Sequence, residues 1–243
     1  MNLSSYRERR LFLIVIHLLL FSSLWFWFNS PASPWLHELD ELIFRKLNGS
    51  LASHSLWQKF WGMLNHRRET QYNLVIAALF NIWAVLQTQE SGLKFRRIKQ
   101  FLYFWICFQI GFMFQDYFFN AFLAVTRSSP SMVLEPVILL SDILNNSQIK
   151  DFSEHSFPSG HAFSLIYWAS FTYVCSPKRI GLLAITLASF LCLPRLFSGA
   201  HWASDTIFSG LLALTWLGWT LNVPLYYRHI NKQSSEVILK QPH

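Results

Sequence analysis

One segment of the chain combines residue types that can transfer a phosphate. Arg195, His201 and Asp205 lie in the run Arg-Leu-Phe-Ser-Gly-Ala-His-Trp-Ala-Ser-Asp. His201 and Asp205 are four residues apart, so a helix places them on one face, where the carboxylate can hold one ring nitrogen and leave the other free as nucleophile or base. Arg195 offers a planar fork of donors suited to phosphate oxygens. A metal pair is the alternative, but the segment offers no third or fourth ligand of similar quality.

A second histidine follows a sequence typical of a helix start, Phe157-Pro158-Ser159-Gly160-His161. Proline, serine and glycine favour the first positions of a helix. Free backbone N–H groups there favour an anion, and Gly160 lets a phosphate approach closely. His161 would then lie in the first turn beside that phosphate. The alternative is an ordinary helix cap with an incidental histidine.

Two further basic segments could contribute to such a site. Arg127 opens the sequence Arg-Ser-Ser-Pro that ends at Pro130, and it could bind phosphate or merely keep its charge at a membrane interface. His66, Arg67 and Arg68 form a run that could hold a second phosphate or an anionic acceptor. A solvated basic patch near lipid headgroups is the alternative interpretation of that run.

The composition indicates that membrane helices position these residues. Hydrophobic residues make up 52% of the 243 residues and charged residues 14%, against about a quarter charged in a soluble domain. The 11 Trp, 23 Phe and 8 Tyr fit a chain packed against lipid. The net charge of +7 does not indicate nucleic-acid binding, because the basic residues are scattered between apolar blocks. The three cysteines have no CxxC spacing and fit neither a disulfide framework nor a zinc site.

Six apolar stretches predict an all-α fold, a polytopic six-transmembrane-helix bundle that forms a single domain over residues 1–243. A crossing helix needs about 20 residues, and the stretches are 11–28, 72–88, 101–125, 162–176, 181–197 and 206–226. The first also resembles a secretory signal, but its 18-residue run exceeds the ~7–15 of a signal peptide, and Ser30-Pro31-Ala32 is a poor cleavage site. We therefore expect it to remain as an anchor.

The polar residues within the third stretch also predict an orientation. Gln109, Asp116 and Asn120 share one face of that helix. Because polar groups facing lipid are costly, we expect this face to point into the bundle, where the three side chains serve a structural purpose.

The distribution of basic residues predicts which ends of the helices are cytoplasmic. With both termini in the cytoplasm, 12 of the 20 Lys and Arg residues lie inside, although the outside loops are much longer. The inside residues are Arg7, Arg9, Arg10, Lys94, Arg96, Arg97, Lys99, Lys178, Arg179, Arg228, Lys232 and Lys240. Residues 127–161 and 195–205 then share the extracytoplasmic face, so two distant loops can build one site.

Together, the three motifs resemble the signature of the type 2 phosphatidic acid phosphatase superfamily. Its usual form is Lys-x6-Arg-Pro, then Pro-Ser-Gly-His, then Ser-Arg-x5-His-x3-Asp. The second part is complete here from Pro158 to His161, and the third differs only by Pro194 in place of serine. The first part departs further. Asn120 stands where lysine is usual, which removes one expected phosphate contact, and the proline is displaced to Pro130.

Within that superfamily, the resemblance is greatest to bacterial lipid A 1-diphosphate synthases and undecaprenyl-diphosphate phosphatases. The Arg-x-Ser-Pro form at 127–130 and the Pro-Arg pair before Gly-Ala-His-Trp are similar to the synthase branch. These enzymes move phosphate from undecaprenyl diphosphate to lipid A or to water. The resemblance implies an enzyme of the bacterial inner membrane with an active site facing the periplasm. Its partners would be membrane lipids, with no nucleic acid and no obligate protein partner.

The resemblance also implies a metal-independent mechanism without a cofactor. His201 attacks the terminal phosphorus and forms a phosphohistidine, while Asp205 orients the ring and His161 is the general acid. The groups that stabilise the transferring oxygens are Arg127, Arg195 and the amides near Ser159 and Gly160. Two other functions are considered: a phosphatase of another lipid such as phosphatidylglycerol phosphate, and a non-catalytic membrane transporter or scaffold. The intact histidines and aspartate argue against the second.

Overall fold

The computed structural model describes residues 6–29, 33–224 and 226, and over these residues the fold is all-α. This part of the chain contains no strand, and its β-pairing consists of two isolated bridges, His66 with Ile149 and Arg127 with His155. The helical elements are α1 (Tyr6–Asn29), α2 (Ser33–Gly49), a 3₁₀ turn (Ser50–Ala52), α3 (Ser55–Leu64), α4 (Glu69–Leu86), α5 (Ser91–Asp116), a π-helical segment (Tyr117–Phe122), α6 (Pro130–Val133), α7 (Leu140–Ile143), α8 (Gly160–Cys175), α9 (Lys178–Phe197) and α10 (Ala203–Asn222).

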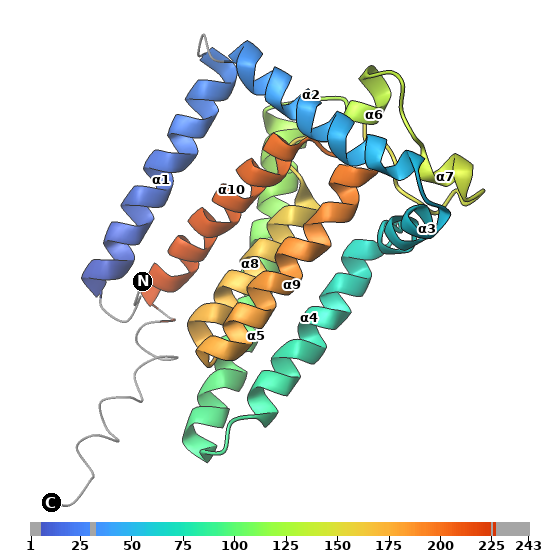
Figure 1. The fold of residues 1–243 in the computed structure, drawn as a ribbon. Helices are drawn as coiled ribbons and strands as arrows, with labels where there is room; N and C mark the ends of the chain where they lie inside the picture. Colours follow the sequence, from blue (N-terminus) through green and yellow to red (C-terminus); the bar gives the residue numbers. More distant parts are fainter. Residues whose placement is uncertain (1–5, 30–32, 225, 227–243) are drawn as a thin grey trace, which may run out of the picture.

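Each of the six apolar stretches lies mainly within one long helix, namely α1, α4, α5, α8, α9 or α10. These helices run side by side (Figure 1), and α8 is central, packed against α4, α5, α9 and α10. α5 begins at Ser91, ten residues before the expected stretch, and its α-helical part ends at Asp116. The all-α fold predicted from the sequence is confirmed.

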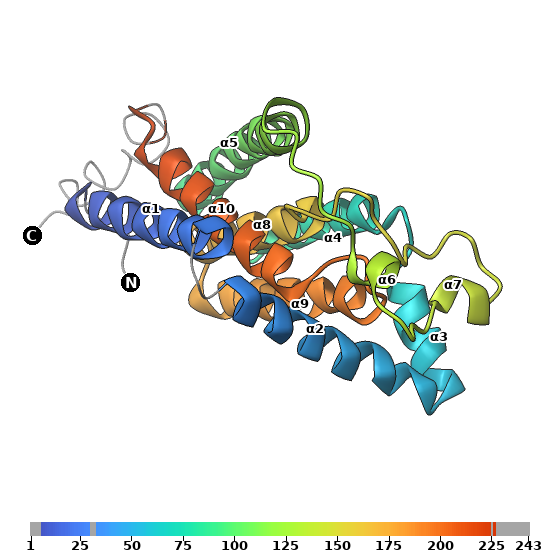
Figure 2. The ribbon, with the colours of Figure 1, turned by 90° about the horizontal axis from the view of Figure 1, so that it is seen from above.

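Two amphipathic helices that the sequence did not predict lie at one end of the bundle, and α2 is the longer of them. It runs from the end of α1 across the ends of α10 and α9 towards α3 (Figures 1 and 2). α2 buries Asp40, Phe44 and Asn48 while it exposes Trp35 and Leu39, since residues four apart share a helix face. Two of its three buried residues are polar, so the sequence shows no apolar stripe there. α2 nevertheless brings a carboxylate, Asp40, to the interior.

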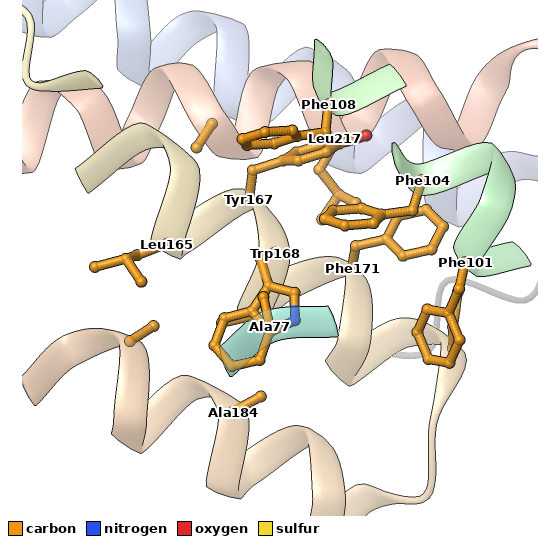
Figure 3. Close-up of a cluster of buried hydrophobic side chains, with 14 of the residues drawn as sticks. Ala77, Phe101, Phe104, Phe108, Leu165, Tyr167, Trp168, Phe171, Ala184 and Leu217 are labelled. Atoms are coloured by element: carbon orange, nitrogen blue, oxygen red, sulfur yellow. The ribbon is translucent and has the colours of Figure 1, made fainter. Parts of the chain in front are cut away.

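Aromatic rings fill the space between α5 and α8 (Figure 3). Phe104 and Phe108 of α5 contact Tyr167, and Phe104 also contacts Phe171, with ring centroids 5.1 to 6.3 Å apart. On α9, the small side chain of Ala184 is fully buried and allows that helix to approach α8 closely. This packing fixes the ends of α8 and α9, where two of the sequence motifs lie.

The surface of the bundle carries much apolar side-chain area. Two helical segments are long and apolar enough to cross a membrane by length and composition, Arg7–Trp27 in α1 and Lys178–Phe197, which is α9. Leu18 and Phe21 on α1 and Leu182 on α9 are each more than half exposed. Such surface fits contact with lipid. The number of crossings and their direction stay predictions.

The polar residues of α5 and the segment after it do not lie as expected. Gln109, Asp116 and Asn120 are exposed, and the Asn120 amide donates to the Asp116 carboxylate at 2.7 Å. The buried polar residues of α5 are instead Arg97, Gln100 and Gln115, and Gln115 continues the aromatic face that includes Phe108. The expectation was wrong because aromatic packing against α8, and not the polar residues, decides which face turns inward.

Some expectations concern residues outside the described part of the chain. Ser30-Pro31-Ala32 lies there, and it bears on retention of the first helix. So do Arg228, Lys232 and Lys240, which bear on the cytoplasmic placement of the C-terminus.

Candidate active site

The two loops predicted to share one site meet at the end of the bundle that α2 crosses (Figure 1). The ring Nδ1 of His201 lies 2.7 Å from the backbone oxygen of Ser156. The hydroxyl of Ser198 donates to the backbone oxygen of Lys150 at 3.1 Å. Between α9 and α10 the chain turns at Gly199, whose φ of 79° is one that residues with a side chain rarely adopt. Segments distant in sequence thus build one cluster.

His201 is held with one ring nitrogen free. A carbonyl can only accept, so Nδ1 carries the hydrogen, and the neutral ring then has a lone pair on Nε2. Among the described residues, Nε2 has no hydrogen-bonding partner. Burial lowers the pKa of His201 well below its usual value, and the positive charges of Lys150 and Arg195 lower that pKa further. The ring is therefore neutral, as a nucleophilic histidine must be.

The expected hydrogen bond between His201 and Asp205 does not form. Nδ1 and Oδ2 are 3.9 Å apart, because Nδ1 donates to Ser156 and the carboxylate has other partners. Oδ2 accepts from the backbone N–H of Trp202 at 2.9 Å and so caps α10. Oδ1 accepts from Arg127. Asp205 thus acts on His201 through its charge and by fixing the start of α10.

Arg127 binds carboxylates in this structure, although the sequence predicts a phosphate ligand. Its guanidinium donates to Asp205 and, at 2.9 Å, to Asp40. The guanidinium carbon also lies 4.2 Å from the ring centre of Trp27 and 4.9 Å from that of Trp202. Burial raises the pKa of Asp205 to about 6 against the opposing charge of Arg127, so the carboxylate is ionised at neutral pH. Arg127 therefore fixes Asp205 in place.

α8 begins as the sequence predicts. Ser159 is its N-cap, and the Ser159 hydroxyl accepts from the backbone N–H of Ala162 at 3.3 Å. Gly160 is the first residue of the helix, and the N–H groups of a first turn have no intrahelical acceptor. This end of α8 therefore offers amide donors beside the histidine that follows.

His161 lies within the protein and contacts other elements through both ring nitrogens. Nε2 is 2.9 Å from the backbone oxygen of Leu191, and Nδ1 is 3.4 Å from the hydroxyl of Thr70. Burial and the charge of Arg195 lower the pKa of His161 to about 3. His161 is thus a neutral imidazole before substrate binds, and it needs a bound anion to hold a proton.

Arg195 is anchored by the segment before α4. Nη1 donates to Oδ1 of Asn65 at 2.9 Å, and Nη2 donates to the backbone oxygen of His66 at 3.1 Å. The side chain is only 3% exposed. The basic run His66-Arg67-Arg68 therefore contacts the cluster through the backbone oxygen of His66.

The side chains of Arg67 and Arg68 lie on the surface beside this cluster. Both are exposed, and Nε of Arg67 donates to the backbone oxygen of Ser147 at 3.0 Å. The charge of Arg67 lowers the pKa of Lys150, so the two side chains are close. This position fits a binding role for an anionic acceptor and fits a solvated basic patch equally well.

Two charged residues that the sequence analysis did not select complete the cluster. The Glu69 carboxylate lies between His161 and Arg195, 3.4 Å and 3.3 Å from their nearest nitrogens. The charge of Lys150 acts on Glu69 and on both histidines. Lys150 is the one Lys or Arg between the first two motifs, and this spacing is the signal that could have found it. Glu69 directly follows the basic run, where an acidic residue suggests only a helix start.

The chemistry of the cluster suits an anion. In the part of the chain that the structure describes, no three His, Cys, Asp or Glu side chains gather as they would around a metal ion. The three cysteines are separate, on α5, α8 and α9. The positive charges that act on both histidines are those of the Arg195 guanidinium and the Lys150 ammonium, and such groups together with helix amides bind phosphate oxygens.

Comparisons with known proteins agree with this chemistry and with the predicted family. Residues 112–228 match the model of the PAP2 superfamily. Over 112 residues the chain is 32% identical to lipid A 1-diphosphate synthase from Escherichia coli (strain K12), a segment covering 46% of this chain and 47% of that relative, or about half its length. The fold is similar to the crystal structure of the first transmembrane PAP2 type phosphatidylglycerolphosphate phosphatase from Bacillus subtilis. The TM-score is 0.51 at 14% identity, with 86% of this chain and 93% of that chain covered.

Proposed function

We propose that this chain, whose residues 112–228 match the model of the PAP2 superfamily, is a membrane enzyme that removes the terminal phosphate of a lipid diphosphate. The donor we propose is undecaprenyl diphosphate, and the acceptor is lipid A 1-phosphate or water. One observation carries the proposal: His201, with Nε2 free, lies in one cluster with the buried His161 and Arg195 and the half-buried Lys150.

In the first step, His201 displaces the lipid. A bond forms between Nε2 and the terminal phosphorus, and the bond from that phosphorus to the bridging oxygen breaks, so the electron pair leaves with undecaprenyl phosphate. The ring becomes positively charged, a state favoured by the hydrogen bond to Ser156 and by the Asp205 carboxylate at 3.9 Å. A proton on His161, held there once the anion has bound, neutralises the leaving group.

In the second step, an acceptor oxygen attacks the phosphorus. The bond from phosphorus to Nε2 breaks, its electron pair returns to His201, and the acceptor proton passes to His161. Through both steps, the transferring oxygens face donors that are in place before substrate arrives: Arg195, Lys150 and the amides near Ser159 and Gly160. Preorganised donors of this kind supply most of the rate gain in phosphoryl transfer.

We further propose that the six long helices span the bacterial inner membrane, with both termini cytoplasmic and the cluster at the periplasmic face. The distribution of Lys and Arg between the loops supports this direction. The outward apolar side chains of α1 and α9 support contact with lipid. An active site at the membrane surface meets the diphosphate of a lipid without drawing its tail into water.

A phosphatase of phosphatidylglycerol phosphate is the second candidate. It is favoured by the fold shared with the phosphatidylglycerolphosphate phosphatase from Bacillus subtilis. At 14% identity that likeness concerns the fold, whereas the likeness to lipid A 1-diphosphate synthase is one of sequence, 32% identity over 112 residues. We therefore place the diphosphate donor first.

The experiment that tests the proposal follows a labelled phosphate. Undecaprenyl diphosphate labelled in its terminal phosphate is incubated with the purified protein in detergent, with and without lipid A, and the products are separated by chromatography. We expect the label to move to lipid A or to inorganic phosphate. Phosphate release only from phosphatidylglycerol phosphate, assayed in parallel, would favour the second candidate. Turnover of neither lipid would leave a non-catalytic transporter or scaffold.

A further inference from the structure

Glu69 is a buried carboxylate that the proposed steps do not use. It is the first residue of α4 and only 5% exposed. Oε1 lies 3.4 Å from Nε2 of His161, and Oε2 lies 3.3 Å from Nη2 of Arg195. Neither oxygen has a partner with full hydrogen-bonding geometry within the described residues, and the one side-chain amide that acts on the carboxylate is that of Asn73, one turn along the same helix. Most buried carboxylates have such partners, so hydrogen bonding does not explain the position of Glu69.

The groups that face the Glu69 carboxylate come from α4 itself, α8, α9 and the loop before α8. They are Asn73, His161, Arg195, Cys192 and Lys150. The two cations in this set are those that the proposed function assigns to the phosphoryl oxygens. When no phosphate is bound, the negative charge of the Glu69 carboxylate therefore balances the positive charges of Arg195 and Lys150.

Binding of a phosphoryl group is unfavourable while Glu69 beside it is ionised. Both are anions, both attract the same two cations, and in a buried site their repulsion is screened little by water. The repulsion is relieved if Glu69 takes up a proton. A neutral carboxyl no longer competes for Arg195, and its hydroxyl can donate to a phosphate oxygen.

We propose that Glu69 is a positioning residue that balances the phosphate-binding cations before substrate arrives and accepts one proton when the phosphoryl group binds. The proposal rests on the proposed function, because it assigns Arg195 and Lys150 to phosphate. Solvent supplies the proton as the anion enters, the proton adds to a carboxylate oxygen, and it returns to solvent when phosphate leaves. No bond to carbon or phosphorus changes.

The sign of the pH dependence follows from the charge of Glu69. Burial raises its pKa to about 7, against the lowering effect of Arg195 and Lys150. Below that pH the carboxyl is neutral and an anion binds freely; above it the anion must drive proton uptake, so affinity falls as pH rises. Burial and the charge of Arg195 lower the pKa of Lys150 to about 8. The loss of the Lys150 charge also weakens anion binding, but it does so at a higher pH than the titration of Glu69. The informative window is therefore about pH 6 to pH 7.5.

The probe is inorganic sulfate, because it stays a dianion across this window while phosphate itself titrates. Binding to the purified full chain in detergent is measured by calorimetry in two buffers of different ionisation heat, which counts protons. Because a bound anion also lets His161 hold a proton, the contribution of Glu69 is measured as the difference from Glu69→Gln. We expect the unaltered protein to take up about half a proton more per sulfate near pH 7, and to lose about fourfold more affinity between pH 6 and pH 7.5. Two results with the unaltered protein alone would overturn the proposal. One is sulfate binding without proton uptake at pH 7, and the other is the absence of sulfate binding at pH 6.

Three variants locate the effect. Glu69→Gln keeps the shape of the side chain but cannot ionise, so its sulfate affinity should change about fourfold less across the window than that of the unaltered protein, and the remaining change is assigned to His161. Arg195→Gln should abolish sulfate binding if the anion occupies this cluster. Glu90→Gln removes an exposed carboxylate at the start of α5, and its sulfate affinity should follow that of the unaltered protein. A Glu69→Gln protein that loses as much affinity as the unaltered protein would refute the assignment to Glu69.

Sulfate binding does not depend on turnover, so the two proposals can fail separately. Proton-linked sulfate binding that requires Glu69, in a protein that hydrolyses no lipid phosphate, would reject the proposed function and keep the role of Glu69 in anion binding. Lipid phosphate turnover with sulfate binding that is independent of pH would reject only the role of Glu69.

Discussion

Replacing Arg127 by methionine separates a structural role for this arginine from phosphate binding. Arg127 joins Asp40 of α2 to Asp205 of α10, and the three side chains are 13%, 4% and 0% exposed. Removal of one partner from a buried ion pair costs about 3–5 kcal/mol, because the other charge stays buried without compensation. We expect Arg127→Met to lower the free energy of unfolding by about this amount and to lower kcat, since Asp205 fixes the start of α10.

The assay is denaturant unfolding of the purified protein in detergent, with kcat and KM measured on the same samples. The matched control is Arg45→Met, which breaks an exposed pair with Glu41 at 42% and 43% exposure. That control should cost about 1 kcal/mol or less. Without Arg127, the pKa of Asp205 rises further above about 6, so the folded variant holds a proton that the unfolded chain has lost. The variant should therefore regain stability as the pH falls towards about 5.

A different outcome would restore the role that the motif predicts for Arg127. If Arg127→Met unfolds like the unaltered protein while its KM rises, the guanidinium binds the phosphate of the substrate. The pairs with Asp40 and Asp205 would then be arrangements that substrate displaces.

The remaining predictions concern the metal, the topology and the acceptor. Turnover should persist in excess chelator, because Arg195 and Lys150 supply the positive charge that a metal would otherwise provide; loss of turnover that magnesium or zinc restores would show the opposite. Reporter fusions after residue 28 or within 131–150 should be extracytoplasmic and fusions within 92–98 cytoplasmic, and the reverse pattern would place the site on the other side of the membrane. Changing Arg67 and Arg68 together to Ala should slow transfer to lipid A by about one to two decades more than release to water, as expected for a charge-assisted contact worth about 1.5–3 kcal/mol. Equal losses in both reactions would assign these arginines to the donor or to the fold.

The sequence predicted the long helices and the meeting of the motifs because both depend on local patterns. Apolar runs identified the six long helices, and the alternation of these helices put residues 127–161 and 195–205 at the same end of the bundle. The helix start at Ser159 followed from residue types alone. These features depend on neighbours in sequence, so they can be read without knowing what packs against them.

The sequence did not predict the contacts that join distant elements. Asp40 lies in an amphipathic helix whose buried stripe is partly polar, so nothing in the sequence showed that it pairs with Arg127. The same pairing, together with the carbonyl of Ser156, explains why Asp205 does not hydrogen-bond to His201. Glu69 gave no signal because its neighbours, Arg195 and Lys150, reach it only in the folded chain.

The central claim is that His201 carries the phosphate during transfer. The most direct test incubates the protein with donor labelled in its terminal phosphate and stops the reaction in alkali, where phosphohistidine survives. Protein-bound label is then mapped by mass spectrometry. Label on His201, with neither label nor turnover in His201→Ala, is the expected result. Label on another residue, or near-normal turnover by His201→Ala, would contradict the account.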